Sequence, residues 1–216
     1  MLRWEDYQGP FGKTAGIVAH KLERRSTTPP RYRTGVILCT LGARDKFLLF
    51  VNDTFEPFSF LSAAFNSGLG QAQNQDPSFG QGSLGYGKRF AVSFAGQSTG
   101  LFFGEFLYPT LFKEDPRYYR LAHGGTRNRL LHAMEHAVIA HRDSGRRMFN
   151  FSEWVGTTST VVLNNAYHPG NDRSPGAVAQ AVGINVMTET GFDVLREFWP
   201  EIARKFKLPF RERPNK

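Results

Sequence analysis

The sequence predicts an all-α protein with four main helices, a shorter helical lead-in before them and a flexible basic tail at the N-terminus. Three observations lead to this prediction. Apolar residues recur at helical spacing from Ala43 onward, and proline or glycine separates the segments. Small residues also recur at four-residue spacing, which forms stripes along which another helix can approach closely. We therefore expect a single helical domain over residues 43–206, between a basic tail at 1–42 and another at 207–216.

The predicted N-terminal tail contains TTPPRYRTG, whose proline and basic residues are typical of a mobile or loosely docked segment. The lead-in starts at Ala43 and places several large apolar residues at helical spacing before Pro57 closes it. These residues are Phe47, Leu48, Phe50, Val51 and Phe55. A second short helix is expected after the proline, followed by a polar, glycine-rich loop.

The first main helix is predicted within LGYGKRFAVSFAGQSTGLFFGEFLYP, residues 84–109. Helical spacing puts Gly96, Gly100 and Gly104 on one stripe, with Gly87 and Ala91 beside it. Each glycine inside a helix costs about 0.8–1 kcal/mol relative to alanine, so the stripe needs a compensating interaction. Close approach of another helix supplies one, either in a membrane or in a tight soluble helix pair.

The second helix is predicted from about Thr126 to Arg142, with Gly145 near its end. The third covers FNFSEWVGTTSTVVLNNAYHP and stops at Pro169. Ser174-Pro175 is a typical start for the fourth, because serine caps a helix and proline is tolerated at its first position. This last helix carries further small residues, among them Gly183 and Gly191, and Pro200 is expected to kink it.

The net charge of +8 is concentrated at the two ends of the chain. Residues 1–35 and residues 196–216 each carry seven Lys or Arg against three Asp or Glu, whereas residues 36–195 hold thirteen of each sign. This distribution suits anionic lipid or solubility and disfavours nucleic-acid binding. The single cysteine, Cys39, excludes an internal disulfide framework. We find no convincing signal peptide and no apolar run of about 18 residues.

The stretch HAMEH carries the candidate chemistry, because His132, Glu135 and His136 spell the inverted zinc-protease motif H-x-x-E-H. On a helix the two histidines lie one turn apart and could bind one zinc ion, with Glu135 activating water. A catalytic zinc needs a third protein ligand, which the sequence does not identify. The alternative is the polar face of an amphipathic helix, and the sequence favours this alternative.

A second cluster is Arg117, Tyr118, Tyr119 and Arg120, within EDPRYYR. Tyrosine and arginine combine an apolar body with a polar tip, which suits a membrane interface. The same residues would also fit an ordinary packed segment at a helix start. The sequence leaves these two interpretations open.

The chain resembles a family of uncharacterised bacterial cell-envelope proteins with no assigned activity. The resemblance extends from Ala43 to about Phe206, and its phrases occur in a fixed order: KFLLFVNDTFEPFSF, FNSGLGQAQN, FGQGSLGYGKRF, EDPRYYR, DSGRRMFNFSE, NNAYHP and EFWPEI. It implies a location in the cell envelope, although such proteins usually begin with an export signal. HAMEH is not part of the family pattern.

These observations predict a non-enzymatic helical protein of the membrane or cell envelope that acts through helix packing or a partner. We expect contact with membrane lipid, a homo-oligomer or an envelope protein partner, and no cofactor. Two alternatives remain. One is a zinc-dependent hydrolase centred on His132, Glu135 and His136, and the other is a soluble helical bundle that binds a partner protein.

Overall fold

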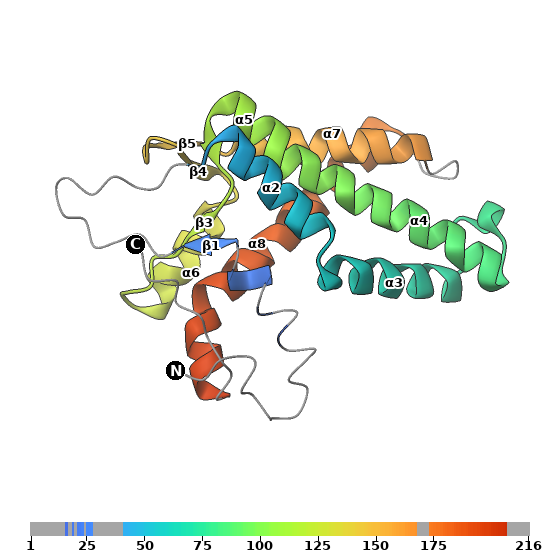
Figure 1. Cartoon of the computed structure of the whole chain (residues 1–216), viewed down its shortest axis with the longest axis horizontal. Helices are drawn as coiled ribbons and strands as arrows, with labels where there is room; N and C mark the ends of the chain where they lie inside the picture. Colours follow the sequence, from blue (N-terminus) through green and yellow to red (C-terminus); the bar gives the residue numbers. More distant parts are fainter. Residues whose placement is uncertain are drawn as a thin grey trace. The chain divides into compact units, whose positions relative to one another are not determined.

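A computed structural model of the chain is mostly helical, which confirms the predicted class in its broad form (Figure 1). The structure describes residues 16, 19, 21–23, 25–27, 41–167 and 173–206. The helices are α2 (Ala43–Thr54), α3 (Pro57–Ala72), α4 (Gly82–Leu101), α5 (Tyr108–Phe112), α6 (Thr126–Glu135), α7 (Phe151–Tyr167) and α8 (Pro175–Lys205). A short 3-10 turn, η2 (Pro77–Phe79), precedes α4, and a π-helical segment, η3 (Phe102–Leu107), joins α4 to α5. The strands are β1 (Ser26–Thr27), β2 (Glu114–Asp115), β3 (Tyr118–Tyr119), β4 (Ile139–Arg142) and β5 (Arg147–Phe149).

The predicted second helix is wrong over residues 136–142. It ends at Glu135, and the segment that follows forms the antiparallel hairpin β4–β5, in which Ile139 faces Phe149 and His141 faces Arg147. Branched residues such as Ile139 pack well on a pleated strand. Gly145 turns the hairpin with a φ of 79°, which favours glycine. The strands make the all-α prediction incomplete, and the helix count also differs. α8 continues through Pro200.

The chain divides into two compact units. Unit 1 contains residues 1–40, 115–150 and 187–216, and unit 2 contains residues 41–114 and 151–186. The single domain predicted over 43–206 stays a prediction, as do its tails. Most of 1–42 and all of 207–216 lie outside the described residues. Within the predicted N-terminal tail, Ala19 and Leu22 are buried in a small apolar core of unit 1 with Trp199 and Ala203.

Unit 1 is held together by short strands and two helical segments. β1 pairs in parallel with β3, and in the second sheet β4 lies between β2 and β5. Residues 187–205 of α8 and the whole of α6 complete the unit.

Unit 2 is a helical assembly in which α3 runs beside α4, and α7 runs beside α4 and η3 (Figure 1). The predicted glycine stripe faces α7. A methyl group placed on Gly96 would lie 3.0 Å from Nδ2 of Asn164, and one on Gly100 would lie 3.6 Å from Cγ2 of Thr160. At the π-helical end of the stripe, a methyl group on Gly156 of α7 would lie 3.6 Å from Cα of Gly104, whereas one on Gly104 itself would meet no atom within 4 Å.

The remaining small residues of the prediction lie elsewhere. Added methyl groups on Gly87, Gly183 and Gly191 would meet no atom within 4 Å, and Ala91 is exposed. Their role in packing stays a prediction. Within unit 2, the helix contact therefore uses only the 96/100/104 part of the predicted set.

Replacing Gly156 by leucine should destabilise unit 2. A methyl group there would already lie 3.6 Å from backbone atoms of Phe103 and Gly104, so the larger side chain must push the two helices apart. Overpacking of this kind costs about 1–3 kcal/mol. Chemical denaturation followed by circular dichroism measures the change. The matched control is Gly183→Leu, where the space is open and the better helix former should leave stability unchanged or raise it. Equal losses in both variants would contradict the close approach.

Candidate functional site

The tyrosine–arginine cluster lies inside unit 1. Tyr118, Tyr119 and Arg120 are buried, and Arg117 forms an ion pair with Asp115 at 2.7 Å. The Tyr119 hydroxyl donates to the same carboxylate at 2.6 Å. The tyrosines are therefore packed residues of the strand β3, whereas the sequence placed them at a helix start or at a membrane interface. A contact between this cluster and a membrane stays a prediction.

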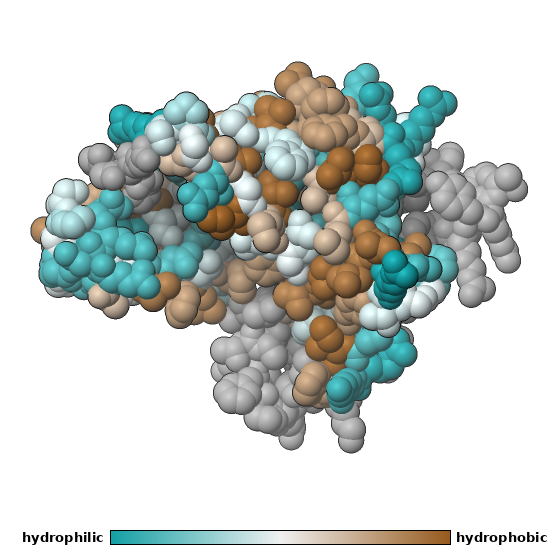
Figure 2. Space-filling model, turned by 180° about the vertical axis from the view of Figure 1, so that it is seen from behind, coloured by the Kyte–Doolittle hydropathy of each residue, from teal (hydrophilic) through white to brown (hydrophobic). Residues whose placement is uncertain are grey.

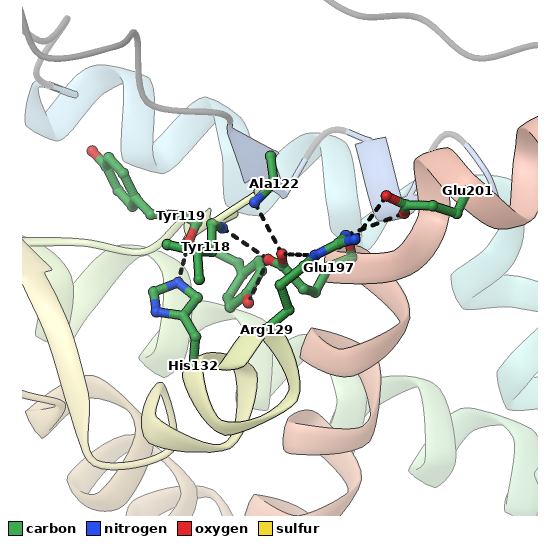
Figure 3. Close-up of polar contacts among 8 residues, drawn as sticks. Tyr118, Tyr119, Ala122, Arg129, His132, Glu197 and Glu201 are labelled. Carbon is green, nitrogen blue, oxygen red and sulfur yellow. Dashed lines mark hydrogen bonds and ion pairs between the residues drawn. The ribbon is translucent and has the colours of Figure 1, made fainter. Parts of the chain in front are cut away.

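A fully buried carboxylate, that of Glu197 on α8, organises the middle of unit 1 (Figure 3). The Tyr118 hydroxyl donates to it at 2.9 Å, and Arg129 Nε of α6 donates at 2.8 Å. The backbone N–H groups of Leu121 and Ala122 donate at 2.9 and 3.0 Å. Four donors from two separate stretches of chain, residues 118–122 and α6, therefore converge on one side chain.

The two backbone donors depend on an unusual turn. Ala122 has a φ of 56°, and this left-handed conformation aims consecutive N–H groups at one anion. Arg129 extends the network to the exposed Glu201, whose Oε1 lies 2.7 Å from Nη1. Because a buried carboxylate is costly unless it is hydrogen-bonded, these donors tie β3, its following loop and α6 to α8.

The same network changes the acidity of both tyrosines. Burial raises the pKa of the Tyr118 hydroxyl, and the negative charge of Glu197 raises it further. Burial and the neighbouring Asp115 likewise raise the pKa of Tyr119. Both phenols therefore stay protonated and act as hydrogen-bond donors.

His132, Glu135 and His136 line one pocket of about 170 Å³. The other residues that line it are Tyr119, Ile139, His141 and Arg147. His132 Nε2 lies 2.7 Å from the carbonyl oxygen of Tyr119, and Figure 3 draws this contact as a dashed line. His136 Nδ1 lies 2.7 Å from the Asp193 carboxylate of α8, and Glu135 forms an ion pair with Arg147 of β5. The motif is thus gathered at one place, with each of its side chains held by a neighbour.

The geometry does not complete a metal site. Within the part of the chain that the structure describes, no three His, Cys, Asp or Glu side chains are arranged to hold one metal ion. The third ligand that the hydrolase alternative requires is thus not identified, and that alternative stays untested. A metal at this place would have to draw His132 and His136 from their present partners or use their other ring nitrogens.

His141, Arg147 and Asp193 were not predicted as part of this site, and Glu197 was considered in the sequence only as one of several carboxylates available to a zinc ion. His141 was assigned to the helix, where it would not have faced His132 across a pocket. Asp193 and Glu197 lie at least 57 positions from His136 and Arg129, the side chains that they contact. No local pattern in the sequence indicates pairing at that distance.

Comparison with known proteins adds no relative, because no family model, no curated protein and no solved structure matches the chain.

Removing the charge of Glu197 should strongly destabilise the chain. Glu197→Gln leaves Arg129 without its buried carboxylate and replaces an acceptor oxygen by an N–H₂ group facing donors. Breaking a buried ion pair in this way costs about 3–5 kcal/mol. The control is Glu201→Gln, which removes the exposed partner of the same arginine and should cost less than about 1 kcal/mol. Thermal unfolding of the two variants measures the difference, and similar losses would show that Glu197 does not hold the unit together.

Proposed function

We propose that this chain is a non-enzymatic helical protein of the membrane or cell envelope, and that unit 2 contacts membrane lipid through its apolar outer faces. The observation that carries the proposal is that residues 47–69 expose no charged side chain. Asp53 and Glu56 are the only charged residues in this stretch, and both are buried. The stretch therefore presents no charged side chain to its surroundings.

Large apolar side chains cover the outside of the same stretch. The exposed fraction is 70% for Phe65, 64% for Phe55 and 52% for Leu61. The full set of exposed apolar residues in α2, α3 and the turn between them is Phe47, Leu48, Phe55, Phe60, Leu61, Phe65 and Leu69. Hydrophobic residues also reach the surface in the space-filling view from behind (Figure 2). Exposed apolar side chains gathered over two consecutive helices are typical of an interaction site.

The inner face of α3 is small and polar instead. Ser59, Ala63 and Ser67 are buried at four-residue spacing, and Ser59 Oγ donates to the Asp53 carbonyl oxygen at 2.7 Å. In α2, Lys46 is buried and its Nζ donates to the Pro109 carbonyl oxygen at 3.1 Å. A helix that turns serine inward and phenylalanine outward has the reverse of the pattern that water favours. An apolar environment outside the unit accounts for this arrangement.

A helix can contact lipid without spanning the bilayer. In the described part of the chain, none of the helices is both long and apolar enough to span a bilayer. Transfer of seven roughly half-exposed Phe and Leu side chains into lipid contributes on the order of 5–10 kcal/mol, which suffices to hold a helix in the interface plane. The proposal is therefore that α3 lies along the membrane surface. The glycine stripe serves a different purpose, because it faces α7 of the same unit.

Vesicle flotation tests this proposal. The full chain should float with phosphatidylcholine vesicles, and the triple variant Leu61→Ser, Phe65→Ser and Leu69→Ser should lose membrane partitioning by about a hundredfold. The side chains are exposed, so the variant should keep its helical circular dichroism spectrum.

The matched control is Leu131→Ser with Met134→Ser, two residues of α6 in unit 1 that are each 52% exposed. This variant should float like the parent chain. If the parent chain stays at the bottom of the gradient while the vesicles float, the lipid contact is contradicted and the soluble partner-binding bundle is favoured. An equal loss in the control variant would show that α3 has no special role.

A further inference from the structure

A second pocket lies within unit 2, between α3, α4 and the connection that joins them. Asn66 and Ser67 line it from α3, Arg89 and Ser93 line it from α4, and the connecting residues 73–81 contribute further side chains. Its volume is about 170 Å³. This is the volume of about six water molecules in the liquid, which leaves room for one sugar-sized ring and excludes larger ligands.

The buried Arg89 side chain fixes the shape of the connection. Its Nε and Nη2 donate to the Gln75 carbonyl oxygen at 3.1 and 2.6 Å, and its Nη1 donates to the Gly80 carbonyl oxygen at 2.7 Å. Asn74 and Asp76 have φ values of 52° and 46°, which are uncommon for residues other than glycine. Such conformations persist where surrounding contacts enforce them, and they cluster at ligand-binding sites. The connection is therefore held ready for a ligand before one binds.

The charges around this pocket balance. Among the described residues that line it, Asp76 and Arg89 are the only charged ones, and they carry opposite signs. Arg89 donates to backbone carbonyl oxygens of the connection, and its guanidinium group lies 5.8 Å from the centre of the Phe79 ring. An anion would be repelled by Asp76, and a cation would be repelled by Arg89. The lining therefore favours a neutral ligand.

Four polar side chains of the lining keep hydrogen-bonding capacity that the chain does not use. The Asn66 amide makes no hydrogen bond to any residue that the structure describes. Gln75 donates through Nε2 at 2.8 Å within the connection, which leaves its Oε1 as an acceptor. The Ser67 hydroxyl donates to a carbonyl of its own helix at 2.6 Å and keeps its lone pairs, whereas the Ser93 hydroxyl accepts from its own helix at 3.4 Å and keeps its proton. The pocket thus offers donors and acceptors together.

We propose that this pocket binds one neutral sugar ring. Each hydroxyl group both donates and accepts, so the adjacent hydroxyls of a sugar match a lining that mixes donors with acceptors. Phe79 supplies apolar surface for the C–H groups of the ring. The chemistry is the same for a free sugar, the end of a glycan and the headgroup of a neutral glycolipid. Because Asn66 and Gln75 are exposed, a sugar reaches the pocket from solution, and the site does not depend on the lipid contact proposed for α3.

Titration of the full chain with methyl glycosides of glucose, galactose and N-acetylglucosamine tests the site. The side-chain amide signals of Asn66 and Gln75 are followed by nuclear magnetic resonance in the absence of vesicles. At least one sugar should shift both signals to saturation, with a dissociation constant on the order of 1 mM, as expected for so small a ligand. Cyclohexanol, a ring of similar size with a single hydroxyl, should bind at least about tenfold more weakly, because it leaves groups of the lining without partners.

Vesicle flotation distinguishes the sources of the sugar. Phosphatidylcholine vesicles are compared with vesicles that also contain a neutral glycolipid carrying the preferred sugar. Stronger partitioning onto the glycolipid vesicles, reversed by the free glycoside, would identify a lipid headgroup as the source, and equal partitioning would identify a sugar in solution. Sugar binding by a chain that floats with neither kind of vesicle would support this site and contradict only the lipid contact of α3.

Two matched variants assign the binding to this pocket. Asn66→Ala should fold normally, because the side chain is exposed on a helix and alanine favours helices, and it should weaken sugar binding by about tenfold. The Gln75 signal reports the affinity of this variant. Asn52→Ala makes the same change at an exposed position of α2 that does not line the pocket, and it should leave the affinity unchanged. The proposal is overturned if no sugar binds saturably, if cyclohexanol binds as tightly as the best sugar, or if the two variants lose affinity equally.

Discussion

Burial of charge is the constraint on which the rest of this structure depends. Among the described residues, seventeen polar or charged side chains are buried, against twelve hydrophobic ones. A buried charge must be paired or hydrogen-bonded, since leaving it without a partner costs several kcal/mol. The interior of each unit is therefore fixed by directional contacts, and large apolar side chains are left to the outside. This arrangement is the reverse of the pattern that water favours, and the proposed lipid contact rests on it.

The constraint acts through Glu197 in unit 1. Its donors fix the loop after β3 and set α6 against α8, since Arg129 reaches both Glu197 and Glu201. The same placement brings His136 to Asp193, one turn earlier on α8. The pocket lined by His132, His136 and His141 thus depends on the Glu197 hydrogen-bond network. Because a helix, a hairpin and a buried strand all contribute side chains, the pocket exists only in the folded unit.

Part of this organisation could be predicted from the sequence. Glycine periodicity in the first main helix indicated close packing, and Gly96 and Gly100 do face α7. The end of α6 was missed because residues 137–142 suit both a helix and a strand, and pairing with β5 decides between them. The partners of Glu197 were out of reach, since Tyr118 lies 79 positions away. The sequence of α3 also does not show whether its apolar face points into the unit or away from it, because the spacing of the apolar residues is the same in both cases.

Nitroxide accessibility at position 65 tests the central claim most directly. A spin label is attached to a Phe65→Cys variant in which Cys39, the only cysteine of the chain, is replaced by serine. Its relaxation in the presence of vesicles is then compared for oxygen, which concentrates in lipid, and for a water-soluble nickel chelate. The account predicts strong relaxation by oxygen and weak relaxation by nickel. Relaxation dominated by nickel would place the outer face of α3 in water and contradict the account.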